Sequence, residues 1–138
     1  MLTKSVLTLA DAKQIALAAE AEALANNWGV VIAVVDDGGH LLYLQRNHDT
    51  QHGSVKLAIM KAKAAVAFKR PTKSSEDAVL SGRLIHLALP GVIPAEGGVP
   101  ILKDDVVIGG IGVSGVRSFQ DGQIAHAGVT TINQQKSQ

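Results

Sequence analysis

Apolar residues recur every three or four positions in some stretches of the chain and form short β-branched runs in others. Residues 8–27 show the first pattern, and Thr8 and Asp11 have the spacing of a helix capping box. Similar patterns predict helices over residues 54–68, 74–83 and 118 to about 134, with Asp121 at the capping-box position of the last. Four helices are therefore expected.

Two predicted β-hairpins separate these helices. The first begins with a run that is β-branched apart from Ala33, and an Asp-Asp-Gly-Gly turn follows it. The second is built around Asp104 and Asp105. The four predicted strands span residues 30–35, 40–46, 99–103 and 106–115. The order helix, hairpin, helices, hairpin, helix predicts a single α+β domain over residues 1–138, in which helices cover an antiparallel sheet.

The predicted helix 54–68 carries apolar residues over most of its circumference. Such a helix is normally buried on more than one side. In a domain of this size one of those sides is expected to face another subunit, so a closed homo-oligomer is predicted. The alternative is that alanine, a good helix former, simply tolerates solvent.

Composition narrows the class of protein. The net charge is +1 and aromatic residues make up only 3%, a composition that lacks both the basic surface and the stacking platforms of nucleic-acid binding. The absence of cysteine excludes disulfides and thiolate metal sites. No stretch reaches the roughly 20 apolar residues of a membrane span, and no signal-peptide run follows Met1, so a cytoplasmic protein is expected.

The glycines at 110–115 match G-x-G-x-x-G literally. A dinucleotide site needs a second parallel strand and an acid about 20 residues downstream, but the chain ends 23 residues after Gly115. We therefore interpret these glycines as a strand on which another element packs closely.

Two groups of side chains are candidates for ligand binding. His48 and His52 follow Arg46 and are four residues apart, so on a helical turn they would face the same way and could bind a metal or haem iron. Otherwise they are exposed polar residues on a loop. Lys56, Lys63 and Arg70 recur every seven residues and could receive carboxylates, or could form a solvated helix face. Lys61 and Lys69 are interpreted as ordinary surface charges.

The connection 84–100 contains three of the four prolines, and a long irregular loop in a compact domain is usually functional. It includes Glu96, Gly97 and Gly98 between two prolines. Backbone amides of such a loop can bind an anion, and Glu96 is the best single candidate for a proton acceptor. A purely structural turn is the alternative.

Several motifs resemble the GlcG/HbpS-like family, which also includes the C-terminal domain of PduO-type proteins. They are VVDDGGHL at 34–41, KAKAA at 61–65, GGVPI at 97–101, IGGIGVSG at 108–115 and AHAG at 125–128. The resemblance implies a profilin-like α-β-α domain and a ring-like assembly, often an octamer. It also implies haem binding, sometimes haem degradation, or a setting in glycolate, glycerol or propanediol metabolism. Where the family has a Met-Asp-Gly-Ala-like stretch, this chain has Asn47-His48-Asp49-Thr50.

Three hypotheses follow. The first is an oligomeric haem- or tetrapyrrole-binding protein, with His48 or His52 at the iron and Arg46, Lys56, Lys63 or Arg70 at the propionates. The second is an enzyme that acts on a small hydroxy- or oxo-acid, with Glu96 as general base and Arg46 or Lys63 binding the substrate carboxylate. The third is an accessory or scaffolding protein without a small-molecule site.

Overall fold

A computed structural model describes residues 1–134, which form a four-stranded sheet and four α-helices. The helices are α1 (Leu9–Ala25), α2 (Gly53–Phe68), α3 (Lys73–Leu80) and α4 (Ser118–Gln134), and a short 3₁₀ turn, η1, spans Leu84–Leu87. The strands are β1 (Val31–Asp36), β2 (Leu41–Arg46), β3 (Gly98–Lys103) and β4 (Val106–Ser114). The α+β fold predicted from the pattern is confirmed, and within the described residues no helix is long and apolar enough to cross a membrane.

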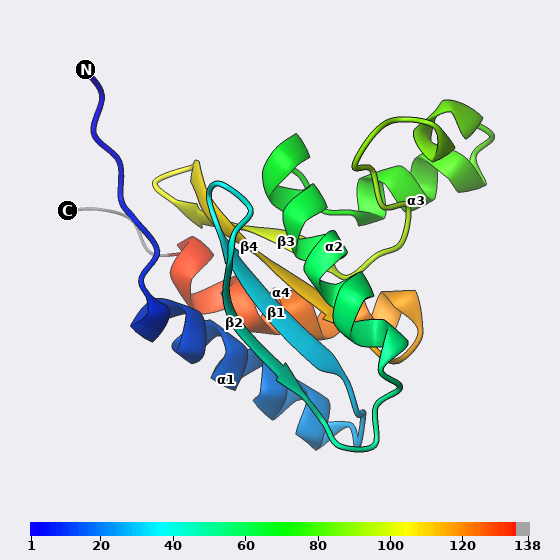
Figure 1. Cartoon of the computed structure of the whole chain (residues 1–138), viewed down its shortest axis with the longest axis horizontal. Helices are drawn as coiled ribbons and strands as arrows, with labels where there is room; N and C mark the ends of the chain where they lie inside the picture. The colour runs from blue at the N-terminus through cyan, green and yellow to red at the C-terminus, as the bar shows by residue number, and fades with distance from the viewer. Residues whose placement is uncertain (135–138) are drawn as a thin grey trace.

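The sheet has the order β2-β1-β4-β3, and all neighbouring strands are antiparallel. Helix α2 covers one face and contacts β4, β1 and β3, whereas α1 and α4 pack together on the other face (Figure 1). This is the expected α-β-α arrangement. The main core lies between the sheet and the α1–α4 pair, and two smaller apolar clusters, one at Ala58 and one at Ala62, lie under α2.

Glycines in β4 bring α2 directly onto the sheet. A Cβ atom at Gly110 would lie 2.6 Å from the carbonyl oxygen of Ala62, and one at Gly112 would overlap the carbonyl oxygen of Ala58. Both oxygens belong to the backbone of α2. The G-x-G-x-x-G sequence therefore lies in β4 except for Gly115, which follows the strand, and its glycines allow close packing, as predicted.

Three local expectations are corrected. Lys69 adopts φ 55° and ends α2, so Arg70 lies beyond the helix and the seven-residue stripe does not continue to it. Helix α3 begins at Lys73, which places Ser74 and Ser75 inside the helix instead of at its cap. Asp121 does not cap Ser118; the backbone N–H of Arg117 donates to Gln120 Oε1 at the start of α4.

Candidate functional site

The turn that follows β2 is held in place by Arg46. Its Nη1 donates hydrogen bonds to the backbone oxygens of His48, at 3.3 Å, and Thr50, at 2.9 Å. The side-chain oxygen of Asn47 accepts a hydrogen bond from the Asp49 N–H at 2.9 Å. The turn is thereby ordered while the His48 side chain stays 88% exposed, with Nε2 3.4 Å from Asp49 Oδ2.

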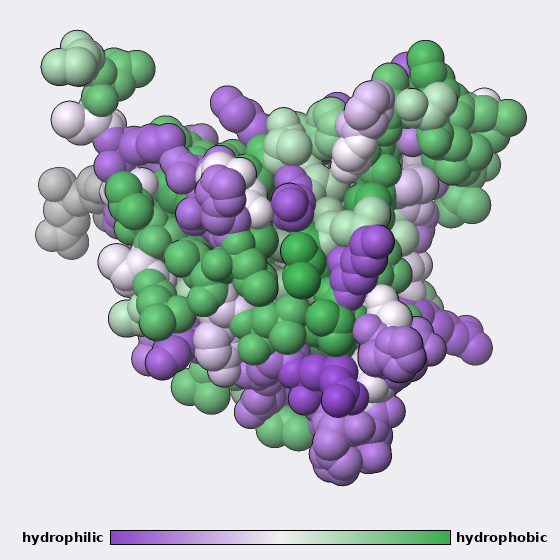
Figure 2. Space-filling view, viewed as in Figure 1, coloured by the Kyte–Doolittle hydropathy of each residue, from purple (hydrophilic) through white to green (hydrophobic). Residues whose placement is uncertain are grey.

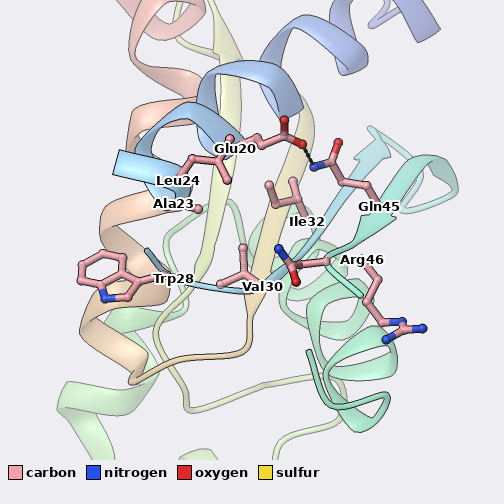
Figure 3. Close-up of a pocket in the computed structure, with 9 residues that line it drawn as sticks. Glu20, Ala23, Leu24, Trp28, Val30, Ile32, Gln45 and Arg46 are labelled. Carbon is pink, nitrogen blue, oxygen red and sulfur yellow. Dashed lines mark hydrogen bonds between the residues drawn. The ribbon is translucent and has the colours of Figure 1, made fainter. Parts of the chain in front are cut away.

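A cavity of about 360 Å³ lies beside this turn, and we call it the Trp28 cavity (Figure 3). Its apolar wall comes from the end of α1 and from β1, and its polar rim comes largely from β2. Its lining residues are Glu20, Ala23, Leu24, Trp28, Val30, Ile32, Gln45, Arg46 and Asn47. A neighbouring cavity of about 330 Å³ shares Leu24, Trp28 and Asn47 with it and reaches Asp49. Asn47 and Asp49, the neighbours of His48 in the chain, therefore line these cavities.

Hydrogen bonds link the two walls of the Trp28 cavity. Gln45 Nε2 donates to Glu20 Oε2, which ties β2 to α1, and the Tyr43 hydroxyl donates to Gln45 Oε1 at 3.1 Å. The Arg46 guanidinium points away from Val30 and Trp28, toward the turn that it holds (Figure 3). The cavity therefore combines an apolar wall with ordered polar groups at its rim.

His48 and His52 do not share a helical turn. His48 lies in the turn after β2, and His52 is the residue before α2, where it makes no side-chain capping hydrogen bond. Between them Thr50 is only 6% exposed, and its hydroxyl has no hydrogen-bond partner in the structure. Helical spacing therefore does not place the two imidazoles on one face.

The predicted cations occupy different surroundings. Lys56 and Lys63 are exposed on α2, whereas the Arg70 guanidinium carbon lies 5.9 Å from the Phe68 ring centroid. Lys63 lines a separate cavity beside the β1–β2 turn. The three side chains therefore do not converge on one ligand as a continuous stripe.

Lys61, interpreted from the sequence as a surface charge, is only 2% exposed, so that interpretation was wrong. Its Nζ donates to the Val113 carbonyl oxygen at 3.0 Å and to Asp121 Oδ2 at 3.1 Å. Lys61 follows Ala58 by three residues and precedes Ala65 by four, and both alanines are buried. This spacing was the sequence signal that could have placed it on the buried face of α2.

The Glu96-Gly97-Gly98 segment covers the buried lysine. Gly97 has φ 135°, and a Cβ atom there would lie 2.9 Å from Lys61 Nζ. The Glu96 N–H donates to Glu76 Oε1 at 3.2 Å, and the Gly98 N–H donates to Thr72 Oγ1 at 2.9 Å. Because these two amides already have partners in the protein, the segment closes the core and does not present them to an anion.

The Glu96 carboxylate lies against Gly122 of α4, where a Cβ atom would overlap it. Burial raises the pKa of Glu96, and the charge of Lys73 opposes the shift. Glu96 lines neither the Trp28 cavity nor its neighbour. A raised pKa suits a general base, but the Glu96 carboxylate packs against the protein and not against either of these cavities.

Burial also raises the pKa of Asp121 to about 6, although the charge of Lys61 pulls it down. Between the ordinary value of 3.8 and about 6 the folded chain holds a proton that the unfolded chain releases. Stability from this group is therefore present below pH 3.8 and is lost as the pH rises to about 6.

We expect the free energy of unfolding of the wild type, relative to that of Asp121→Asn, to fall over this interval. The slope should reach at most about 1.4 kcal/mol per pH unit. Urea unfolding of both proteins between about pH 4 and about pH 7 measures it. A difference that stays constant or increases with pH would contradict the assignment.

Comparisons with known proteins agree with this fold, a small α-β-α domain. Residues 7–130 match the family described as haem degrading protein HbpS-like, and the chain belongs to that family. The resemblance noted in the sequence is confirmed.

Three relatives illustrate the match. Protein GlcG of Escherichia coli strain K12 is 42% identical over 114 residues, which cover 83% of this chain and 85% of GlcG. The crystal structure of the Klebsiella pneumoniae protein ORFY has a TM-score of 0.84 at 32% identity and covers 98% of this chain and 99% of its own. The structure of a PduOC:haem complex has a TM-score of 0.81 at 34% identity and covers 94% of this chain and 96% of its own.

Proposed function

We propose that the chain binds haem at the Trp28 cavity, with the iron on the side of the His48 turn. The observation that carries the proposal is a cavity with an apolar wall beside an ordered turn whose histidine is exposed. Support also comes from the PduOC relative, whose solved structure is a haem complex. When bound, haem supplies an iron that a neutral imidazole can ligate.

The residues present fit such a group. Leu24, which is 59% exposed, and the partly buried Trp28 offer an apolar surface to a porphyrin face, and binding sites typically combine apolar walls with a few placed polar groups. His48 supplies a nitrogen ligand, with His52 as the alternative. Arg46 holds the turn through Nη1 and is, among residues 1–134, the only cation that lines the Trp28 cavity. We therefore assign a propionate contact to Arg46, and not to Lys56, Lys63 or Arg70.

A hemin titration followed by absorbance tests this proposal. We expect a saturable Soret shift in the wild type and binding at least about tenfold weaker in His48→Ala/His52→Ala, because loss of an imidazole that would ligate the iron should cost more than about 1.4 kcal/mol. The two single variants decide which histidine ligates. His126→Ala, at an exposed position of α4, is the matched control. An unsaturable response, or a double variant that behaves like the control, would refute these roles.

The enzymatic alternative receives less support. It requires Glu96 to meet a substrate that Arg46 or Lys63 holds, but the three residues line no common cavity. The Glu96 carboxylate instead packs against Gly122, and the Glu96 N–H donates to Glu76 Oε1. Turnover of a small hydroxy-acid that is abolished by Glu96→Gln, in an intact protein, would restore this alternative.

We also propose that the chain forms a homo-oligomer through α3 and η1. This arm projects from the body at the upper right, where apolar side chains gather on the surface (Figures 1 and 2). Its exposed aliphatic residues are Leu80, Leu84, Ile85, Leu87 and Leu89. A cluster of this kind marks an interaction site, and a symmetric copy is the simplest partner. The octamer implied by the resemblance is the assembly size that we expect.

Light scattering tests the assembly. The wild type should have a mass well above one subunit, and Leu84→Asp/Leu87→Asp should shift it toward the monomer, because a charge at an apolar interface is desolvated without a partner. Leu17→Asp, at an exposed leucine of α1, is the control. An unchanged mass in the arm variant would place the interface elsewhere.

A further inference from the structure

A third cavity, of about 440 Å³, lies apart from the Trp28 cavity and its neighbour. It opens between the β1–β2 turn, the C-terminal half of α2 and Gly91 of the connection before β3. Figure 1 shows the β1–β2 turn beside the end of α2. The buried residues Ala64 and Val66 supply its apolar lining. We call it the Lys63 cavity.

Lys63 is positioned there by its packing. Its Cε and Cγ lie 3.8 and 3.9 Å from where a Cβ atom of Gly39 would be, so its aliphatic stem runs along the glycine turn. No hydrogen bond or ion pair to residues 1–134 occupies its ammonium group, in contrast to Lys61, which has two protein acceptors. Lys63 therefore presents an uncompensated charge beside an apolar surface.

The only acid that lines the Lys63 cavity does not neutralise this lysine. Asp37 forms an ion pair with Lys4, and that hydrogen bond lowers the pKa of Asp37. The turn itself is ordered, because Asp36 Oδ1 accepts hydrogen bonds from the N–H groups of Gly38 and His40, both at 2.9 Å. Because Lys4 neutralises Asp37, the positive charge of Lys63 at the edge of the cavity is not cancelled.

From this arrangement we infer that the Lys63 cavity binds a small organic monocarboxylate whose apolar body contacts Val66 and Ala67. The carboxylate meets the Lys63 ammonium in a charge-assisted hydrogen bond, and the uncharged remainder of the ligand covers the aliphatic surface. This inference does not rest on haem binding, because the Lys63 cavity and the Trp28 cavity share no lining residue.

The probe is 4-fluorobenzoate, followed by ¹⁹F NMR on the full chain, with 4-fluorobenzamide as its neutral counterpart. We expect saturable binding of the acid and at least about tenfold weaker binding of the amide, because only the acid forms an ion pair with Lys63. Hemin titration of the same sample reports the Trp28 cavity separately, so a failure of either site is distinguished from a failure of the other.

Two variants define the site. Lys63→Met keeps most of the aliphatic stem and should weaken binding of 4-fluorobenzoate at least about tenfold, while Ala67→Phe should weaken it by filling the cavity. Lys56→Met is the matched control, because Lys56 is also an exposed lysine of α2 but does not line this cavity. Equal binding of acid and amide, no saturation, or equal losses in Lys63→Met and Lys56→Met would each overturn the inference.

Discussion

Replacement of Lys61 by methionine is expected to lower the free energy of unfolding by about 3–5 kcal/mol at about pH 8. Methionine fills most of the lysine volume, so the loss comes from charge and not from a cavity. The Asp121 carboxylate would keep its hydrogen bond from the Val116 N–H, at 3.1 Å, but would lose its buried cationic partner. Chemical denaturation measures the change.

A double-mutant cycle isolates the interaction energy between Lys61 and Asp121 from the other effects of each substitution. Asp121→Asn removes the second charge and leaves an oxygen that can accept from Val116, so Lys61→Met/Asp121→Asn should be more stable than Lys61→Met alone. Lys56→Met, at an exposed site on the same helix, should change stability by no more than about 0.5 kcal/mol. Equal effects of Lys61→Met and Lys56→Met would show that the buried ion pair does not form.

Gly112→Ala is expected to lower the free energy of unfolding by more than about 4 kcal/mol, so that a large fraction of the molecules does not fold. The added Cβ would overlap the Ala58 carbonyl oxygen and lie 2.6 Å from the Ala62 nitrogen. Both atoms belong to the α2 backbone, so no side chain can rotate to make room. The helix would have to move off β4, and apolar contacts under α2 would be lost. Circular dichroism and thermal unfolding of the soluble fraction measure the effect.

Gly53→Ala is the matched glycine control. Gly53 begins α2, and nothing lies within 4 Å of the position that its Cβ would take. Alanine there should be neutral or should stabilise the protein by up to about 1 kcal/mol, because it restricts the unfolded chain. If both variants were equally stable, close packing of α2 on β4 would be disproved.

Local patterns predicted the elements well because their causes are local. The Thr8–Asp11 capping box forms as expected, with the Asp11 N–H donating to Thr8 Oγ1 at 3.1 Å. The helix predicted over 8–27 spans Leu9–Ala25, and the strand predicted over 40–46 spans Leu41–Arg46. Capping groups, β-branched runs and Asp-Gly turns act over a few residues, so they can be recognised without the fold.

The candidate site was only partly predictable. Arg46 and His48 were candidates from the sequence, but the Trp28 cavity beside them depends on α1, β1 and β2 lying together, and those segments are separated along the chain. Lys63 was paired with Arg70 by spacing, although the left-handed conformation of Lys69 ends the helix between them. Spacing predicts a common face only while the helix continues.

Lys61 shows most clearly what only the tertiary structure decided. A lysine is usually exposed, and nothing near it in the sequence indicates an anion that could bury it. Its partner, Asp121, lies 60 residues later in α4, on the opposite face of the sheet, and the Lys61 ammonium group meets it beside the Val113 carbonyl oxygen of β4. The sequence alone determined the elements, the α+β class and the family, because these follow from short-range patterns and motifs. The buried charge pair, the two cavities and the separation of the cations were decided by contacts between distant segments, which pattern and spacing do not encode.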